Sequence, residues 1–293
     1  MSKSALGRII KRTEVPIPRM VLMTDTAEVC GRGLLYALVR SHLCCGTDVF
    51  YLTTSHSPGY IKDFVKDEDT PGKVEFLDGA SDPCGWDENK TALSLNEPLH
   101  DIFKNRYSSA AIRKGKATFV VDRLEDVTHH QDSSQLVRGL HALSAEDYVE
   151  QLIVFCGRDI VAESMLSAVC HIARATVHLM PTKPCSCRVV LRKPSGKVIK
   201  AHEEFSLTSE LQVQDIHPVH VKEVPCVAES SDTDAILAAQ TTFNLSLTDD
   251  QRIEKNKLLL PHTRVQSLGG QILYTPDDAD DWDEDDPDDD LDI

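Results

Sequence analysis

The sequence predicts an α/β fold in which helices cover both faces of a mostly parallel sheet that ends in antiparallel strands. Short, nearly continuous apolar runs recur along the first 160 residues, and stretches with helical periodicity separate them. Such runs are typical of parallel strands that are buried on both faces. Two later β-rich runs flank a strong turn signal at residues 194–196, which indicates a hairpin that finishes the sheet.

Each element of this prediction follows from one stretch of sequence. The five predicted parallel strands are residues 20–24, 48–54, 73–79, 117–124 and 151–159. After the first strand, a helical stripe is formed by Leu34, Leu35, Leu38, Val39 and Leu43. A second amphipathic helix is predicted at residues 160–173, and the β-rich end at residues 175–180 and 187–207.

Beyond this core the sequence predicts a less regular organisation. Residues 209–240 carry prolines, serines and acids without a clear period, as a linker does. A capping box, Thr248 with Gln251, then indicates a short helix. The predicted segments are an N-terminal extension (1–18), the core (19–207), a linker (208–240), a C-terminal interaction arm (241–276) and a disordered acidic tail (277–293).

The net charge of −16 comes mostly from the tail. Residues 277–293 hold twelve acidic side chains and no basic one, so the rest of the chain carries only −4. The acidity therefore does not exclude a basic surface elsewhere. Nine irregularly spaced cysteines predict reduced thiols and a cytoplasmic, also nuclear, location. The sequence has no apolar run of eighteen residues, so no membrane association is expected.

The junction after the first strand is where a nucleotide-binding fold places its phosphate loop. A Walker A loop needs Gly, four residues, Gly, Lys and then Ser or Thr. In the aligned stretch "TAEVCGRG" only Gly31 fits. Thr26 replaces the first glycine, Arg32 the lysine and Gly33 the hydroxyl residue, while Glu28 adds a negative charge. The pattern favours a plain turn over a degenerate nucleotide site, and both interpretations stay open.

Other chemical signals are weak. Asp122 ends an apolar strand at the Walker B position, so the two loops together indicate the geometry of an ATPase without its chemistry. A zinc site at His129-His130 or at Cys185 and Cys187 lacks a second ligand pair. The sequence also lacks the motifs of hydrolases and metalloproteases. We therefore expect no catalytic residue, no cofactor and no metal.

Basic residues form three small clusters that could contact an RNA backbone or simply face solvent. Because no aromatic residues lie between them, base stacking is not expected. The clusters are Lys3, Arg8, Lys11 and Arg12; Arg113, Lys114 and Lys116; and Arg188, Arg192, Lys193, Lys197 and Lys200.

The last fifty residues contain, in order, "TTFNLSLTDDQRIEKNKLLLP", "GGQILYTPDD" and "DEDDPDDDLDI". In these motifs the chain resembles the Elongator complex protein 5 family, and a looser likeness covers "GRGLLYALV" and "DPCGW". The resemblance implies a RecA-like, P-loop NTPase-like fold with degenerate Walker motifs and an extended C-terminal arm. Family members form a hetero-hexameric ring with Elongator proteins 4 and 6. That ring binds tRNA and serves the catalytic Elongator subcomplex, which adds carboxymethyl-type groups to the wobble uridine (U34). No catalytic residue carries over to this chain.

We therefore expect the chain to be a non-catalytic ring subunit whose arm and tail dock on a neighbour. The predicted docking residues are apolar: Phe243, Leu245, Leu247, Leu258, Leu259, Leu260, Tyr274, Trp282 and Ile293. An arm of this kind gains affinity through effective concentration once the cores meet. Two alternatives remain, namely a divergent NTPase and an acidic-tailed chaperone of basic proteins.

Overall fold

The computed structural model describes residues 4–65, 70–86, 93–110, 115–208 and 210–219. Its strands are β1 Met20–Asp25, β2 Val49–Thr53, β3 Val74–Asp78, β4 Ala117–Val121, β5 Val149–Gly157, β6 Ala175–Met180, β7 Ser186–Arg192, β8 Val198–Leu207 and β9 Val213–Pro218. Its helices are α1 Ala5–Ile10, α2 Arg32–Cys44, α3 Pro58–Val65, α4 Leu99–Ser109, α5 Leu124–Thr128, α6 Ser133–Ala145 and α7 Glu163–Ile172. None of these helices is long and apolar enough to cross a bilayer.

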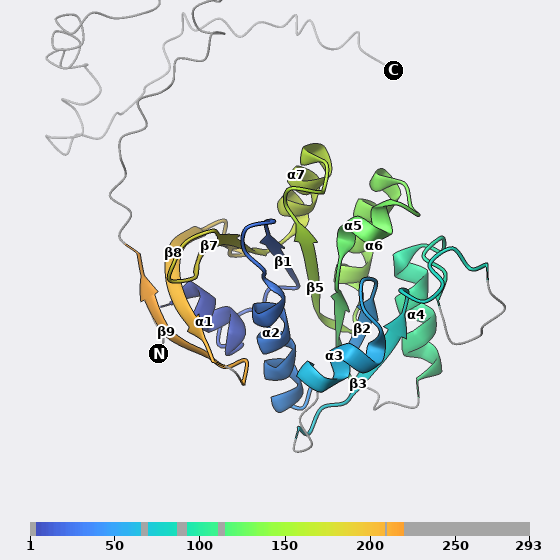
Figure 1. Cartoon of the computed structure of the whole chain (residues 1–293), viewed down its shortest axis with the longest axis horizontal. Helices are drawn as coiled ribbons and strands as arrows, with labels where there is room; N and C mark the ends of the chain where they lie inside the picture. Colours follow the sequence, from blue (N-terminus) through green and yellow to red (C-terminus); the bar gives the residue numbers. More distant parts are fainter. Residues whose placement is uncertain (1–3, 66–69, 87–92, 111–114, 209, 220–293) are drawn as a thin grey trace, which may run out of the picture. The chain divides into compact units, whose positions relative to one another are not determined.

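The described strands form one sheet in the order β3-β2-β4-β5-β1-β6-β7-β8-β9 (Figure 1). The first six strands of this order are parallel to their neighbours. From β6 onward each pairing is antiparallel. The predicted α/β class is confirmed, and the five predicted parallel strands correspond to β1 to β5.

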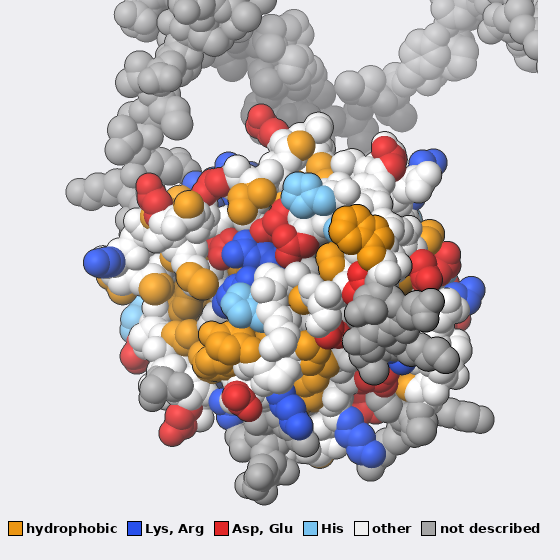
Figure 2. All heavy atoms as spheres, turned by 45° about the vertical axis from the view of Figure 1, so that its right-hand side comes forward, with side chains coloured by type: hydrophobic (Ala, Val, Ile, Leu, Met, Phe, Trp, Pro, Cys, Tyr) orange, Lys and Arg blue, Asp and Glu red, His pale blue; other side chains and the backbone are white. Residues whose placement is uncertain are grey.

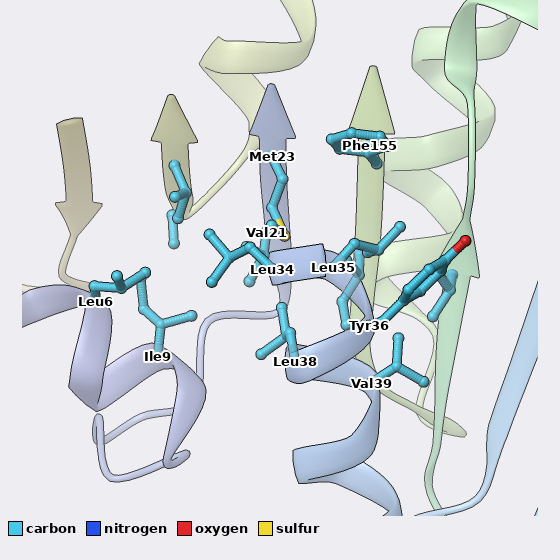
Figure 3. Packing of buried hydrophobic residues seen from close by; sticks show 14 of the residues in the cluster. Leu6, Ile9, Val21, Met23, Leu34, Leu35, Tyr36, Leu38, Val39 and Phe155 are labelled. Carbon is cyan, nitrogen blue, oxygen red and sulfur yellow. The ribbon is translucent and has the colours of Figure 1, made fainter. Parts of the chain in front are cut away.

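Alternating side chains of the sheet build two hydrophobic layers. Val21 and Met23 of β1 pack with α1, α2 and α3, and Figure 3 shows this cluster from close by. Met20 and Leu22 point to the other face, where α4, α5, α6 and α7 cover them. Because β1 is buried on both faces, all of its residues are buried, which explains its continuous apolar run.

The N-terminal segment, predicted as an extension, contributes a helix to the core. Helix α1 has only six residues, too few to be stable alone. Glu203 of β8 accepts hydrogen bonds from the Ser4 hydroxyl at 2.9 Å and from the Ala5 and Leu6 amides at 2.7 and 2.8 Å. This buried carboxylate satisfies the first amides of α1, while Leu6 and Ile9 pack beneath it.

The sheet extends beyond the predicted core boundary at residue 207. Strand β9 pairs with β8 and carries mostly exposed or partly exposed side chains, so it lacks the alternation that identifies a strand. Residues 213–218 of the predicted linker therefore belong to the sheet. Residues 220–240 of the linker, the interaction arm and the acidic tail lie outside the described residues.

A buried histidine in α2 predicts acid sensitivity. The Nε2 group of His42 donates to the Gln151 amide oxygen at 2.9 Å, and the Thr118 hydroxyl donates to Nδ1, also at 2.9 Å. The Gln151 amide group in turn donates to the Pro18 carbonyl, which fixes its orientation. Burial, assisted by the charge of Arg12, lowers the pKa of His42 to about 3.

Since the unfolded state binds a proton near pH 6.5 and the folded state does not, stability should fall as pH drops below 6.5. His42 alone should remove about 2 kcal/mol of unfolding free energy between pH 7.5 and pH 5. Urea unfolding at the two pH values measures this difference. In the variant His42→Gln, whose new side chain cannot titrate, the difference in unfolding free energy between the two pH values should be smaller by a similar amount. Equal pH dependence of both proteins would contradict this assignment.

Candidate functional site

The candidate site lies at the carboxyl edge of the parallel strands, between the ends of β1, β4 and β5. In open α/β sheets this edge forms the ligand-binding crevice. A short loop joins β1 to α2, and Figure 2 shows a face where acidic, basic and histidine side chains meet beside hydrophobic ones. The site can therefore be tested directly against the requirements of a nucleotide.

The loop after β1 uses its own amide groups internally. Thr26 and Val29 exchange backbone hydrogen bonds of 3.4 and 3.1 Å across a tight turn. The Ala27 amide donates to Asp159 at 2.7 Å, and the Gly31 amide donates to the Asp25 carboxylate at 3.0 Å. A phosphate loop instead directs such amides at the ligand. These four donors are already paired without one.

Apolar side chains pack closely against the same loop. A Cβ atom on Gly31 would lie 2.9 Å from the Phe155 ring and 3.0 Å from the Leu179 side chain. Glycine is therefore required here by close packing. The guanidinium of Arg123 lies 5.2 Å from the centre of the Phe155 ring on its face, a cation–π contact. This packing narrows the space that a phosphate cradle would need.

The residues at the Walker lysine and Walker B positions interact with each other. Arg32, the first residue of α2, donates from Nη2 to the Ser55 hydroxyl at 2.8 Å and from Nη1 to His56 Nδ1 at 2.8 Å. The same Nη1 lies 3.7 Å from the Asp122 carboxylate. Burial, the largest single effect, lowers the pKa of Arg32, but the Asp122 carboxylate together with Tyr36 and Tyr51 outweighs it, and the net shift is upward. Arg32 thus serves as an internal counter-charge.

Asp122 is fully buried directly after β4 and is saturated by protein donors. Its Oδ1 accepts from the Tyr51 hydroxyl at 3.1 Å, and its Oδ2 accepts from the Ser55 hydroxyl at 2.9 Å. With Arg32 beside it, the carboxylate has three partners within the protein. A Walker B aspartate must instead leave its oxygens available to magnesium or its water ligands.

A second ion-pair group lies beside the first. Arg123 contacts Glu125 at 2.6 Å and Asp25 at 3.5 Å, and the Gly157 amide donates to the same Glu125 oxygen at 3.1 Å. Burial raises the pKa of both Asp25 and Glu125 above their usual values, against the opposing effect of Arg123. The chain thus balances its own charges at the site.

The structure brings together two of the residues singled out from the sequence, Arg32 and Asp122. Thr26 lies in the turn, and Gly33 packs under β8, where an added Cβ would approach Leu207 within 2.6 Å. Sequence reasoning missed Asp25, Arg123 and Glu125. The only feature of the sequence that could have indicated these three residues is their position, since each is a charged residue at or just after the end of a strand.

The remaining residues singled out from the sequence are the predicted docking residues and the possible zinc ligands. The predicted docking residues from Phe243 to Ile293 lie outside the described part of the chain. Cys187 is buried and Cys185 exposed. Within the described ranges, no group of three or more metal-ligating side chains is found.

Comparison with curated proteins shows the family. Elongator complex protein 5 of Danio rerio is 30% identical to this chain over 297 residues, which cover 93% of this chain and 95% of that protein. The chain belongs to the Elongator complex protein 5 family. Elongator complex protein 5 of Homo sapiens is 25% identical over 301 residues, covering 94% of this chain and 97% of its relative.

A family model agrees with this membership: the model described as Elongator subunit Iki1 matches residues 183–275, from the antiparallel end of the sheet into the predicted arm. Among solved structures, a KaiC-like protein from Pyrococcus horikoshii is similar, with a TM-score of 0.47 and 12% identity. That similarity covers 68% of this chain and 89% of that one. A solved ATPase domain is similar with a TM-score of 0.45.

Proposed function

We propose that this chain is a non-catalytic subunit of the Elongator complex. In this proposal it joins Elongator proteins 4 and 6 in a hetero-hexameric, RecA-like ring in the cytoplasm and nucleus. The ring binds tRNA and supports the catalytic subcomplex in carboxymethyl-type modification of wobble uridine (U34). The single observation that carries the non-catalytic role is the Arg32–Asp122 pair, which occupies both charged positions of a nucleotide site.

The charges of this site support a structural role. A working NTPase leaves a cation free for phosphate and a carboxylate free for magnesium. Here the cation and the carboxylate neutralise each other at 3.7 Å, and Ser55 bonds to both. Binding ATP would require these bonds to break and the buried charges to find new partners. That cost favours a protein that keeps the architecture of the fold but not its chemistry.

An exposed aromatic cluster beside this site supports the subunit role. His56, which accepts from Arg32, stacks on Tyr60 with ring centres 4.8 Å apart, and Tyr60 meets Phe64 at 5.1 Å. Tyr60 is 51% exposed and Phe64 39% exposed. Exposed neighbouring aromatic rings are typical of surfaces that a partner protein covers. In our proposal, a neighbouring subunit of the ring covers this aromatic cluster.

Calorimetric titration with ATP and magnesium tests the non-catalytic assignment. We expect no binding heat with the full chain, because the loop amides and the two charged side chains are already paired. An ATPase of known nucleotide affinity serves as the positive control under the same buffer conditions. Saturable binding that requires magnesium and is lost in Asp122→Asn would overturn the assignment in favour of a divergent NTPase.

A further inference from the structure

A groove with a volume of about 930 Å³ lies between α7 and the antiparallel end of the sheet. Leu166 and Cys170 of α7 form one wall. Arg158 and Val161, in the loop between β5 and α7, close one end. Side chains of β6, β7 and β8 form the opposite wall.

Strand register places three polar side chains in one row across the wall of the groove that β6, β7 and β8 form. Arg188 of β7 lies opposite His178 of β6 on one side and opposite His202 of β8 on the other. Their neighbours Cys187 and Val189 point to the other face, into the layer that contains α1. The groove is therefore lined by the face of β7 and β8 that α1 does not cover.

The groove carries uncompensated positive charge. Arg158, Arg188 and Lys200 line it with exposed side chains, and none of the three has an ion pair within the described part of the chain. Among the described lining residues only Glu163 is acidic. Burial, together with the charges of Arg158 and Arg188, lowers the pKa of His178 to about 4. The depressed pKa is consistent with a positive potential inside the groove.

Between the charges, the lining is apolar. Val161, Leu166, Val190 and Cys170 contribute apolar surface to it. An RNA backbone would use the cations but would leave this surface without a partner. Base stacking is no substitute, because the described lining residues include no Phe, Tyr or Trp, and the rings of His178 and His202 are only partly exposed. Apolar pockets rimmed by cations instead match a peptide that alternates carboxylates with apolar side chains.

We propose that this groove binds an acidic peptide segment of a partner protein, with carboxylates on Arg158, Arg188 and Lys200 and apolar side chains against Leu166 and Val161. Opposite charges would steer the segment into the groove, and the apolar contacts would hold it in register. The inference goes beyond the proposed ring role, since it depends on neither nucleotide chemistry nor tRNA.

Fluorescence anisotropy tests the proposal with the full chain and a labelled 15-residue peptide of Asp and Glu that carries three leucines. A matched peptide replaces the leucines with serine and keeps every charge. The variant Arg188→Glu should weaken leucine-peptide binding about tenfold or more, because it reverses the central charge. The control Lys104→Glu, an equal charge change on exposed α4, should bind as the wild type does. The serine peptide should bind about tenfold more weakly than the leucine peptide.

Four results would overturn the proposal. Absence of peptide binding would do so, as would equal loss in the two charge-reversal variants. If both peptides and a 15-nucleotide oligouridylate bind equally well and all lose affinity in Arg188→Glu, the groove recognises negative charge alone and RNA is the better occupant. If the leucine peptide binds only after truncation at Pro276, the occupant is the acidic end of this chain rather than a partner's segment.

Discussion

Replacing Asp122 with alanine is expected to lower the free energy of unfolding by about 3–5 kcal/mol, because it leaves a partly buried arginine without its counter-charge. Asp122 has no exposed surface, and Arg32 is only 15% exposed. The substitution also removes the acceptor of the Tyr51 and Ser55 hydroxyls. An unpaired buried polar group costs further stability.

Urea denaturation of the wild type and of Asp122→Ala measures this loss. Asp63→Ala, at an exposed position in α3, is the control and should stay within about 0.5 kcal/mol of the wild type. Adding Arg32→Met to Asp122→Ala should recover part of the lost stability, since the stranded charge is then gone. A double variant whose loss is the sum of the two single losses would show that Arg32 and Asp122 do not act as a pair.

Truncation at Ala239 is expected to weaken association with the proposed ring neighbour, Elongator protein 4, about 100-fold or more. The deletion removes the predicted docking residues of the arm, including Phe243 and Tyr274, and also the acidic tail. Without the arm, binding rests on the core faces alone, and the gain in affinity that comes from linking a second contact to the first is lost. Surface plasmon resonance with immobilised protein 4 measures the loss.

A second truncation, at Pro276, separates the arm from the tail. It keeps the arm but removes Trp282 and Ile293, so we expect a smaller loss of affinity than with the longer deletion. Circular dichroism should show that both truncated chains retain the folded core. Unchanged affinity after truncation at Ala239 would exclude the arm as a docking element.

The sequence predicts the central strands well because burial on both faces leaves little choice of residue. The run from Met20 to Asp25 and the run from Ala117 to Val121 are buried throughout. Edge elements lack that constraint. Strand β9 is mostly exposed, and α1 has only six residues, whose stability depends on distant Glu203. Neither produces a periodic pattern that sequence reasoning could detect.

The candidate site is only partly predictable for a related physical reason. A motif comparison can locate Arg32 and Asp122 individually, because their distances along the chain from strand ends are defined. It cannot show that they lie 3.7 Å apart with Ser55 between them, since that depends on the packing of β2 against β4. The contact of Arg123 with Asp25 likewise arises from strand order, which places β4 and β1 on either side of β5.

The proposed role as a non-catalytic ring subunit is tested most directly by the mass of the assembly. Native mass spectrometry of the chain mixed with Elongator proteins 4 and 6, without nucleotide, measures it. We predict a single six-membered species that contains two copies of each protein. A chain that stays monomeric while both partners are present and folded would contradict the proposed function.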